Sequence, residues 1–394
     1  MEHRPLVIIG SGPAGTASAL FLQRQNPQLA RDALILERAH HPRPKVCAGG
    51  LIPHTLACLH ELEVGLSVPN AAVHRGRVDV PGRSVTHEAH DLCRVVRRDL
   101  FDHSLVRVCR ERGIEVREDE KVLELRRQGD GIRIETERGN YHARVVIGAD
   151  GSGSMARRAL VGGGRQCVGK AVMADVAVAA VDWSGFEESR YDFSFVPVAA
   201  GLRGYVWAFP CLIDGAPHAN VGVYSVDAGG TGPQLMKALR AQLDAMGAPA
   251  VPVKSFPIRW YGRGVHVAAP HVLLAGDAAG VDPLMGEGIS FAFEYGRQAA
   301  GAVTRAWASG DFSFADYEQE IASSWMGRKL RRLGLAVRLF YGPAWRLCFP
   351  LAGRSWRVQD IALRWYNGVD GLDRCSVWDL LGGYMRRRLQ PLNS

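Results

Sequence analysis

The 394 residues include 48 Lys and Arg, 40 Asp and Glu, and 47% hydrophobic residues, the balance of a soluble globular chain long enough for two or three domains or one large domain. The eight cysteines form no C-x-x-C pair, which argues against a structural zinc site or a secreted disulfide framework, so we expect no metal and a reducing, cytoplasmic location. Neither an N-terminal secretion signal nor an apolar run of about 18 residues is visible, so we expect no export and no transmembrane helix.

The N-terminal elements are predicted as strand, helix and strand, over residues 5–10, 16–25 and 32–37. Gly10, Gly12 and Gly15 form a G-x-G-x-x-G turn between the first strand and the helix. Gly10 permits the tight turn, Gly12 lets a pyrophosphate approach the backbone, and Gly15 lets the helix pack on the strand. Glu37 ends the second strand, where an acidic side chain can bind a ribose hydroxyl. This unit predicts a dinucleotide site.

The rest of the chain alternates between strand-rich and helical stretches. In chain order we expect strand–helix–strand over 93–119, three alternating strands over 121–148, strands over 172–260 with one amphipathic helix over 233–246, strand–loop–helix over 271–303, and helices to the end. No repeat and no Pro/Ser-rich linker separates these stretches. The domains are therefore expected to be interleaved.

Two further glycine–aspartate elements follow predicted strands. "GADGSGSMARR" contains Asp150, Gly151 and Arg157, and "LLAGDAAGVDPLMGEGIS" contains Gly276 and Asp277. An acid at a strand end can hold a ribose or ribitol hydroxyl, and a following helix N-terminus can face a phosphate. Together with the N-terminal turn, these elements resemble the FAD-dependent oxidoreductases of the hydroxybenzoate-hydroxylase fold, over roughly residues 5–310.

The resemblance implies an α/β fold in which a Rossmann-like FAD-binding domain is interleaved with a β-rich substrate domain and followed by a helical region. The expected boundaries are 1–75, 90–170 and 265–310 for the FAD-binding domain, 76–89 and 171–264 for the substrate domain, and 311–394 for the helical C-terminal region.

The same resemblance assigns residues to FAD. It brings Asp277 to the ribitol and pyrophosphate region and places "PLMGEGI" beside the isoalloxazine ring. "RRDLFD" matches a family pattern in which Arg98 contacts FAD, with Arg97 as the neighbouring alternative. The positions implied in FAD binding are Gly10, Gly12, Pro13, Ala14, Gly15, Glu37, Arg38, Lys45, Arg98, Asp150, Gly151, Gly276, Asp277, Pro283, Gly286, Gly288 and Ile289.

Two stretches resemble the geranylgeranyl reductase family. "GYVWAFP" (204–210) is similar to its aromatic-x-Trp-x-Phe-Pro motif, and "KVCAGGL" (45–51) to its Lys-x-Cys-Gly-Gly-Gly-Leu segment, with Ala48 in place of a glycine. The resemblance implies that this segment lines the substrate side of the flavin, that Gly49 and Gly50 permit close backbone approach, and that Cys47 faces the reacting carbon. The alternative role for Cys47 is a small buried apolar side chain. Met285, where relatives often have Thr, is a second departure near the ring.

By this resemblance the chain reduces a C=C double bond of an isoprenoid or similar apolar substrate. Hydride from reduced FAD and a proton from Cys47, or from a water beside it, are added to the two alkene carbons. Aromatic residues are expected to line the slot for the chain, although Trp207 could equally fill the core; they are Phe193, Phe195, Tyr205, Trp207 and Phe209. The sequence has no second G-x-G-x-x-G, so NADPH, ferredoxin or another donor must reach the flavin without a separate Rossmann domain.

Other classes remain open because fold does not decide function. A flavin monooxygenase acting on an aromatic or polyketide substrate is the main alternative. A flavin halogenase is disfavoured because that family carries Trp-x-Trp-x-Ile-Pro and a lysine, whereas position 205 is Tyr and residues 48–120 contain no lysine. A non-enzymatic flavin-binding protein is the last class.

The C-terminal region carries the excess positive charge. Residues 326–394 contain 13 Arg and Lys against 4 Asp and Glu, interleaved with aromatic residues. This composition predicts peripheral contact with an anionic membrane. A solvated basic surface over a hydrophobic cap is the alternative. No recognition motif supports nucleic-acid binding, so none is expected.

Overall fold

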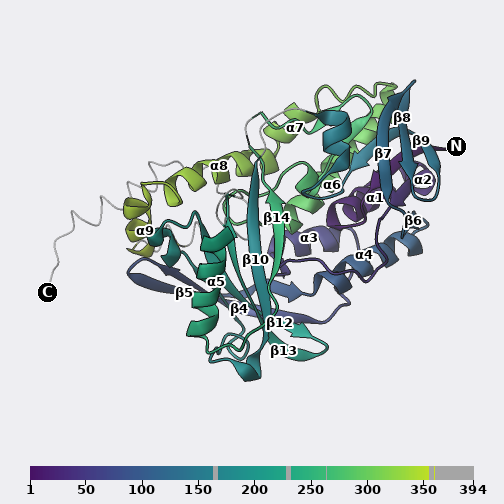
Figure 1. Ribbon diagram of the computed structural model, residues 1–394. Coiled ribbons are helices and arrows are strands. Elements are labelled where there is room, and N and C mark those ends of the chain that lie inside the picture. The colour runs from purple at the N-terminus through teal and green to yellow at the C-terminus, as the bar shows by residue number, and fades with distance from the viewer. Residues whose placement is uncertain (163–166, 228–231, 263, 355–358, 360–394) are drawn as a thin grey trace.

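A computed structural model describes residues 1–162, 167–227, 232–262, 264–354 and 359. The chain forms two sheets, with helices against the first and a helical segment running across to the second (Figure 1). The predicted fold class, α/β with a helical C-terminal region, is confirmed.

The first sheet has a parallel core around β1. Its order is β15-β16-β9-β1-β2-β6, with a β7–β8 hairpin added antiparallel to β9. Val7, Ile8 and their neighbours in β1 are fully buried, as expected for a parallel strand covered on both faces. The strands are β1 (Glu2–Ile9), β2 (Leu34–Leu36), β6 (Glu115–Arg117), β7 (Val122–Gln128), β8 (Gly131–Thr136), β9 (Asn140–Gly148), β15 (Ala268–Ala269) and β16 (Val272–Leu274).

Helices α1 and α6 pack closely beside the first sheet. A Cβ placed on Gly296 of α6 would lie 2.7 Å from the Cβ of Ala17 in α1, so only a glycine allows this approach. The predicted long helix of small residues is thereby confirmed. The helices of this half are α1 (Pro13–Gln25), α2 (Pro27–Asp32), α3 (Pro53–Glu61), α4 (Arg98–Glu111) and α6 (Ile289–Ser309).

The second sheet is antiparallel except where β11 pairs with β4. Its order is β14-β10-β13-β12-β11-β4-β5-β3. The predicted amphipathic helix, α5 (Gly232–Ala245), buries Leu235, Leu239 and Leu243 against one face. The strands are β3 (Gly50–Leu51), β4 (Asn70–Val80), β5 (Arg83–Val96), β10 (Val168–Ala177), β11 (Arg190–Ser194), β12 (Gly204–Ile213), β13 (Ala216–Ser225) and β14 (Lys254–Arg259).

Three expected domain boundaries fall inside strands of the second sheet, and one of them, 170/171, divides β10 (Val168–Ala177). The boundaries at 75/76 and 89/90 cut through β4 and β5, which pair from Asn70↔Val96 to Val80↔Arg83 and belong entirely to the second sheet. The hairpin is continuous because each strand hydrogen-bonds the other along nearly its whole length. Gly50 and Leu51 also join this sheet through β3.

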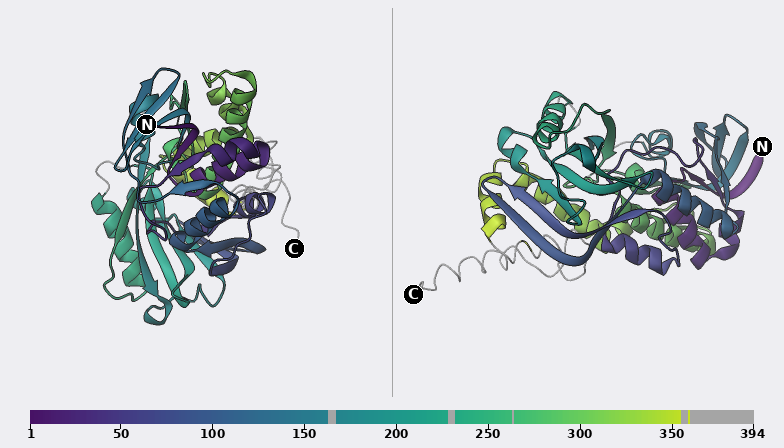
Figure 2. Two further views of the ribbon diagram at one scale, coloured as in Figure 1. Left: turned by 90° about the vertical axis from the view of Figure 1, so that its right-hand side faces the viewer. Right: turned by 90° about the horizontal axis from the view of Figure 1, so that it is seen from below.

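The C-terminal helices run along one side of both halves. They are α7 (Tyr317–Ser323), α8 (Trp325–Phe340) and α9 (Trp345–Arg354). α8 buries Leu330, Leu333 and Val337, and α9 lies beside the β4–β5 hairpin (Figures 1 and 2). None of the helices in the described ranges has the length and apolar character needed to span a bilayer. The remainder of the predicted helical region, 355–358 and 360–394, lies outside the described residues.

Candidate active site

The three glycines of the N-terminal turn differ in their backbone angles and in the atoms that surround them. Gly10 has φ +99°, a conformation that favours glycine, and a Cβ on Gly15 would lie 1.9 Å from the Gly10 carbonyl oxygen. Gly12 has ordinary extended angles, and a Cβ there would meet only the end of the Arg43 side chain at 3.6 Å. The protein itself therefore leaves the face of Gly12 open, at the N-terminus of α1, where an anion is favoured.

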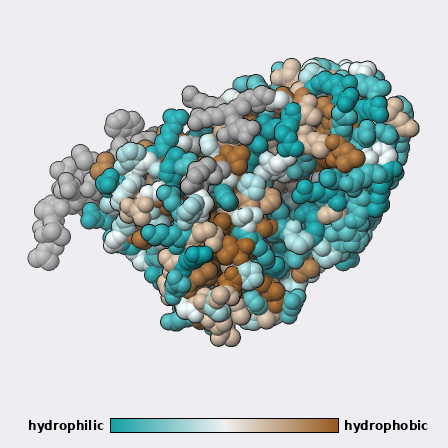
Figure 3. Space-filling model, viewed as in Figure 1, coloured by the Kyte–Doolittle hydropathy of each residue, from teal (hydrophilic) through white to brown (hydrophobic). Residues whose placement is uncertain are grey.

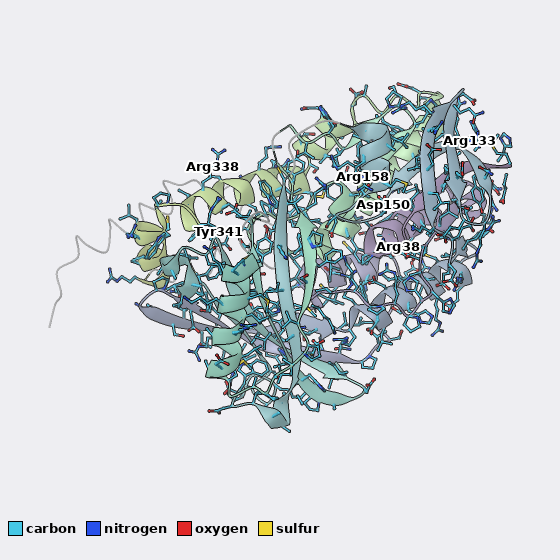
Figure 4. All side chains as sticks on the ribbon, viewed as in Figure 1. Arg38, Arg133, Asp150, Arg158, Arg338 and Tyr341 are labelled. Atoms are coloured by element: carbon cyan, nitrogen blue, oxygen red, sulfur yellow. The ribbon has the colours of Figure 1, made fainter. Side chains whose placement is uncertain are left out.

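Glu37 ends β2 beside this turn and is buried. It accepts hydrogen bonds from the Ser11 backbone N–H (2.9 Å) and the Ser11 hydroxyl (2.8 Å). Burial alone would raise the pKa of Glu37, but the Arg43 guanidinium and the Ser11 groups outweigh burial, so the pKa is lowered and the carboxylate is charged. Arg38, the next residue, is exposed, and its expected contact with FAD stays a prediction. Figure 4 shows Arg38 and Asp150 on the same part of the fold.

Asp150 follows β9 at the same sheet edge. Its Oδ2 accepts hydrogen bonds from the backbone N–H groups of Met155 (2.6 Å) and Ala156 (3.2 Å), and Gly151 has φ +78°. Burial raises the pKa of Asp150. Its Oδ1 is buried without a hydrogen-bond partner among the described residues. Such an unpartnered buried acceptor is consistent with a polar ligand that completes the site.

A charged cluster joins the Cys47 segment to α4. Arg98 donates to both oxygens of Asp102, at 2.8 and 3.0 Å, and the Cys47 sulfur lies near enough to Arg98 to act on its pKa. Burial lowers the pKa of Arg98, but the Asp102 carboxylate, together with the nearby sulfur, outweighs burial and the pKa is raised. The neighbouring alternative, Arg97, points elsewhere and pairs with Asp175 at 3.2 Å. The contact of Arg98 with FAD remains a prediction.

Lys45 lies in the same cluster. Burial lowers its pKa to about 8, although the charge of Asp277 opposes the shift. The Nζ atom of Lys45 stands 3.3 Å from the ring centroid of Phe256. The structure thus brings Lys45, Cys47, Arg98 and Asp277 together, although they come from distant parts of the chain.

The third glycine–aspartate element begins at the 3₁₀ turn η4 (Gly276–Ala278) and continues into α6. Asp277 accepts a hydrogen bond from the Ser152 hydroxyl (3.0 Å), and a Cβ on Gly288 would lie 3.3 Å from the Asp277 carboxylate. Arg157 braces the turn by donating to the carbonyls of Ala278 (2.7 Å) and Ala279 (3.2 Å). Gly276 and Gly286 have φ +60° and +66°, and Ile289 is buried where α6 begins.

Three tyrosine hydroxyls hold the segment between Asp282 and Gly286. Tyr224 donates to the carbonyl of Pro283 (3.0 Å), Tyr341 to that of Leu284 (2.7 Å) and Tyr205 to that of Met285 (2.6 Å). They come from β13, the end of α8 and β12, so three separate elements position the segment that the family resemblance places beside the isoalloxazine. Sequence reasoning missed this arrangement, because strand periodicity identifies a buried tyrosine but not the acceptor of its hydroxyl.

Asp282 is a buried carboxyl that the sequence analysis also missed. Its Oδ1 accepts from the Leu284 N–H (2.6 Å), and Glu287, Lys329 and the three tyrosines surround it. Burial raises the pKa of Asp282 from 3.8 to about 7, against the Leu284 and Met285 N–H groups, which lower it.

This shift predicts a pH effect on stability. The folded state keeps the Asp282 proton up to about pH 7, whereas the unfolded chain loses it near 3.8, so stability falls as pH rises through this window. Asp282→Asn cannot ionise, so relative to wild type it should gain stability, on the order of a few kcal/mol at most, at pH 8 but not at pH 4. Thermal unfolding at both pH values measures the difference.

Asp311→Asn serves as the control, because Asp311 is exposed and its hydrogen bonds with Ser313 lower its pKa. That variant should show no gain at pH 8. The same difference in Tm between wild type and Asp282→Asn at pH 4 and pH 8 would contradict the assignment.

The Cys47 segment meets the aromatic face of the second sheet. Gly49 has φ +83°, and its Cβ would lie 1.9 Å from the Val96 carbonyl oxygen; a Cβ on Gly50 would lie 3.1 Å from the Phe209 ring. Both glycines are therefore explained by packing on β5 and β12. Their expected approach to a flavin ring stays a prediction, as does the role of Cys47, whose half-buried sulfur accepts from the Gly49 N–H at 3.4 Å.

The expected substrate residues form one buried aromatic group. Phe193 lies 5.3 Å from both Tyr205 and Phe209, and Tyr205 lies 5.9 Å from Trp207, all between ring centroids. Alternation along one strand would put Phe193 and Phe195 on the same strand face, but β11 ends at Ser194, so Phe195 lies outside the strand. Phe195 still packs on Tyr205, at 5.7 Å, and its backbone turns because a 3₁₀ segment begins there.

The indole N–H of Trp207 also takes part in a polar hydrogen-bond network. Its Nε1 donates to Asn220 (2.8 Å), Asn220 donates to Asp175 (2.7 Å), and Asp175 pairs with Arg97. A polar cavity of about 310 Å³ also borders Trp207, but Arg77, Arg190, Asp182 and Asp192 line it. Those charged walls do not suit an apolar substrate, so we do not assign the cavity to the reaction.

One cluster of metal-ligating residues lies between α3 and α6. His54 Nε2 stands 2.9 Å from Glu294, and Cys58 lies 3.8 Å from His54 and 3.7 Å from Glu294. Arg297 already contacts both Cys58 (3.6 Å) and Glu294 (3.4 Å), so a guanidinium occupies the place of the cation. We therefore assign no metal to this cluster.

Comparison with known proteins shows the family of this chain. Residues 4–298 match the family described as FAD binding domain. The chain is 31% identical over 331 residues, 76% of each chain, to a menaquinone reductase of Mycobacterium tuberculosis, and 27% identical over 364 residues to digeranylgeranylglycerophospholipid reductase 3 of Methanosphaera stadtmanae, covering 84% of this chain and 85% of the relative.

Solved structures show the same fold. A geranylgeranyl bacteriochlorophyll reductase-like protein of Thermoplasma acidophilum superposes with a TM-score of 0.76 at 22% identity, covering 97% of this chain and 96% of that one. A flavin-dependent brominase and a p-nitrophenol 4-monooxygenase of Pseudomonas putida, both 19% identical, share the fold as well. At these identities the structures establish the fold alone.

Proposed function

This chain belongs to the FAD-binding-domain family and resembles its geranylgeranyl reductases, and from that premise we propose that it reduces carbon–carbon double bonds of an isoprenoid or similar apolar substrate. It is an FAD-dependent oxidoreductase. The residues present fit the cofactor: Gly12 leaves an open face at a helix N-terminus, and the buried Oδ1 of Asp150 has no hydrogen-bond partner among the described residues.

The observation that carries the proposal is the contact between three parts of the protein: the aromatic group, the Cys47 segment and the segment that follows Asp282. The aromatic group of the second sheet contacts the Cys47 segment where Phe209 faces Gly50, and it holds the segment that follows Asp282 through Tyr205. An apolar wall thus adjoins both segments that the family resemblance places at the flavin. The names of the relatives, menaquinone and digeranylgeranylglycerophospholipid reductases, denote lipids with isoprenoid chains and support this substrate class.

The protein must deliver a proton for this reaction. Reduced FAD, when bound, supplies the hydride. An isolated double bond is a poor hydride acceptor, so an acid must protonate the second carbon as the hydride arrives. Cys47 is the proposed donor: its thiol gives a proton to carbon, and the nearby Arg98 guanidinium would stabilise the thiolate left behind.

We also propose that an external donor reduces FAD, since the sequence has only one G-x-G-x-x-G. NADPH and reduced ferredoxin are the candidates. The FAD-loaded protein is mixed with each donor under anaerobic conditions. The donor that reduces FAD is the one that causes loss of flavin absorbance.

The reaction class is tested by product analysis under argon. Reduced protein is mixed with prenyl quinones, prenyl diphosphates or aromatic polyketides, and the products are analysed by mass spectrometry. A reductase adds two hydrogens per double bond without oxygen. The main alternative, a monooxygenase, would stop under argon and incorporate an atom from labelled dioxygen in air. Free reduced FAD without protein is the control.

A further inference from the structure

The outer surface of α8 and α9 is both basic and apolar. Leu335, Leu339 and Leu347 are 52, 40 and 78% exposed, unusual values for leucine. Arginines 331, 338 and 346 are exposed on the same two helices. Figure 4 shows Arg338 pointing away from the body of the protein, whereas Tyr341 points into it. We call this surface the α8–α9 face.

The charge of the segment that carries the α8–α9 face is one-sided. From Trp325 to Arg354 the chain carries 7 Arg and Lys and no Asp or Glu. Elsewhere the visible surface is mixed: in Figure 3 hydrophilic residues cover most of the first-sheet half, and hydrophobic ones gather over the second sheet. Neither self-pairing nor a basic partner suits a segment without acidic residues, whereas an anionic partner does.

Helical spacing puts both kinds of side chain on one face. Arg331 and Leu335, and likewise Leu335 and Leu339, are four residues apart, with Arg338 between the leucines. Leu330, Leu333 and Val337 fill the opposite, buried face. Nucleic acid would use the arginines but leave the leucines exposed, whereas a bilayer interface accommodates both, with arginine heads at the phosphates and leucines in the acyl boundary.

We propose that the α8–α9 face docks on an anionic lipid bilayer, with Leu335, Leu339 and Leu347 inserted and the arginines facing the headgroups. The inner side of the same helix reaches the active site. Tyr341 donates to the Leu284 carbonyl (2.7 Å), and the buried Lys329 is close enough to Asp282 and Glu287 for their charges to act on it. Docking would therefore bring a lipid-soluble substrate within one helix of the flavin-side segment, a consequence that rests on the proposed function; the docking itself does not.

Vesicle sedimentation tests the proposal with no substrate and no turnover, so its failure is separate from that of the reaction. The FAD-loaded protein should sediment with equimolar phosphatidylcholine–phosphatidylglycerol vesicles, not with phosphatidylcholine alone, and high salt should release it. Arg338→Glu/Arg346→Glu should weaken partitioning at least about tenfold, since each basic residue near the surface contributes. Leu335→Ser/Leu339→Ser/Leu347→Ser should weaken it while leaving the charge unchanged.

The matched control is Arg126→Glu/Arg133→Glu, which makes the same charge change on the β7–β8 hairpin at the far end of the molecule (Figure 4). It should bind vesicles nearly as wild type does. Flavin absorbance and Tm verify that each variant is folded. The proposal is overturned if the control loses as much vesicle binding as the α8–α9 variants, or if wild type does not bind anionic vesicles. It is also overturned if the leucine variant keeps its vesicle binding and, in sedimentation velocity, only dissociates a dimer.

Discussion

Gly12→Val is expected to purify as a folded protein without bound FAD. Gly12 has φ −71° and ψ −178°, which valine adopts without strain, and its Cβ would meet only the flexible end of Arg43 at 3.6 Å. The added side chain would instead occupy the open face where the pyrophosphate must approach the backbone. Flavin absorbance measures FAD occupancy, and circular dichroism with Tm measures folding.

Valine substitutions at two other glycines are the controls for this experiment. Gly65→Val is the neutral control, because nothing lies within 4 Å of its Cβ position and it is exposed. Gly15→Val should fail to fold, because its Cβ would lie 1.9 Å from the Gly10 carbonyl oxygen. Full flavin occupancy in Gly12→Val would show that the pyrophosphate does not bind at this turn.

Cys47→Ala is expected to keep FAD but lose turnover by about 10²- to 10⁴-fold, the usual range for removing a general acid. Cys47→Ser keeps a weaker donor and should fall between the alanine variant and wild type. FAD should be retained because the sulfur lies on the Arg98 side of the cluster, while the open glycine turn and Asp150 are untouched. Single-turnover rates under argon and flavin occupancy are the two measurements.

Cys348→Ala is the control for Cys47, since Cys348 is also a half-buried free thiol but lies in α9. It should react at the wild-type rate. Should Cys47→Ala also react at that rate, with activity dependent on dioxygen, both the proton-donor role and the reductase assignment would be wrong.

Local features of the site could be predicted because their physics is local. The Gly10–Gly15 turn depends only on the strand before it and the helix after it, and Glu37 follows the next strand. Their spacing in the sequence therefore predicts both features. Period-two and period-3.6 patterns likewise identified many strands of both sheets and the helix α5, but not β3, β4 or the first part of β5, for which no element was predicted. The buried aromatic group of Phe193, Tyr205 and Phe209 followed from the alternation of side chains along a strand.

Tertiary structure alone decided how distant residues meet. Lys45, Cys47, Arg98 and Asp277 converge because α4 and η4 pack around the Cys47 segment, and three tyrosine hydroxyls from different elements hold Pro283, Leu284 and Met285. The burial of Asp282, the exposure of Arg38 and the backbone contact that requires a glycine at position 49 depend on the same packing. A pattern along the chain records which side chains point inward, but desolvation and hydrogen-bond partners are set by atoms far away in sequence, which only the folded arrangement brings within reach.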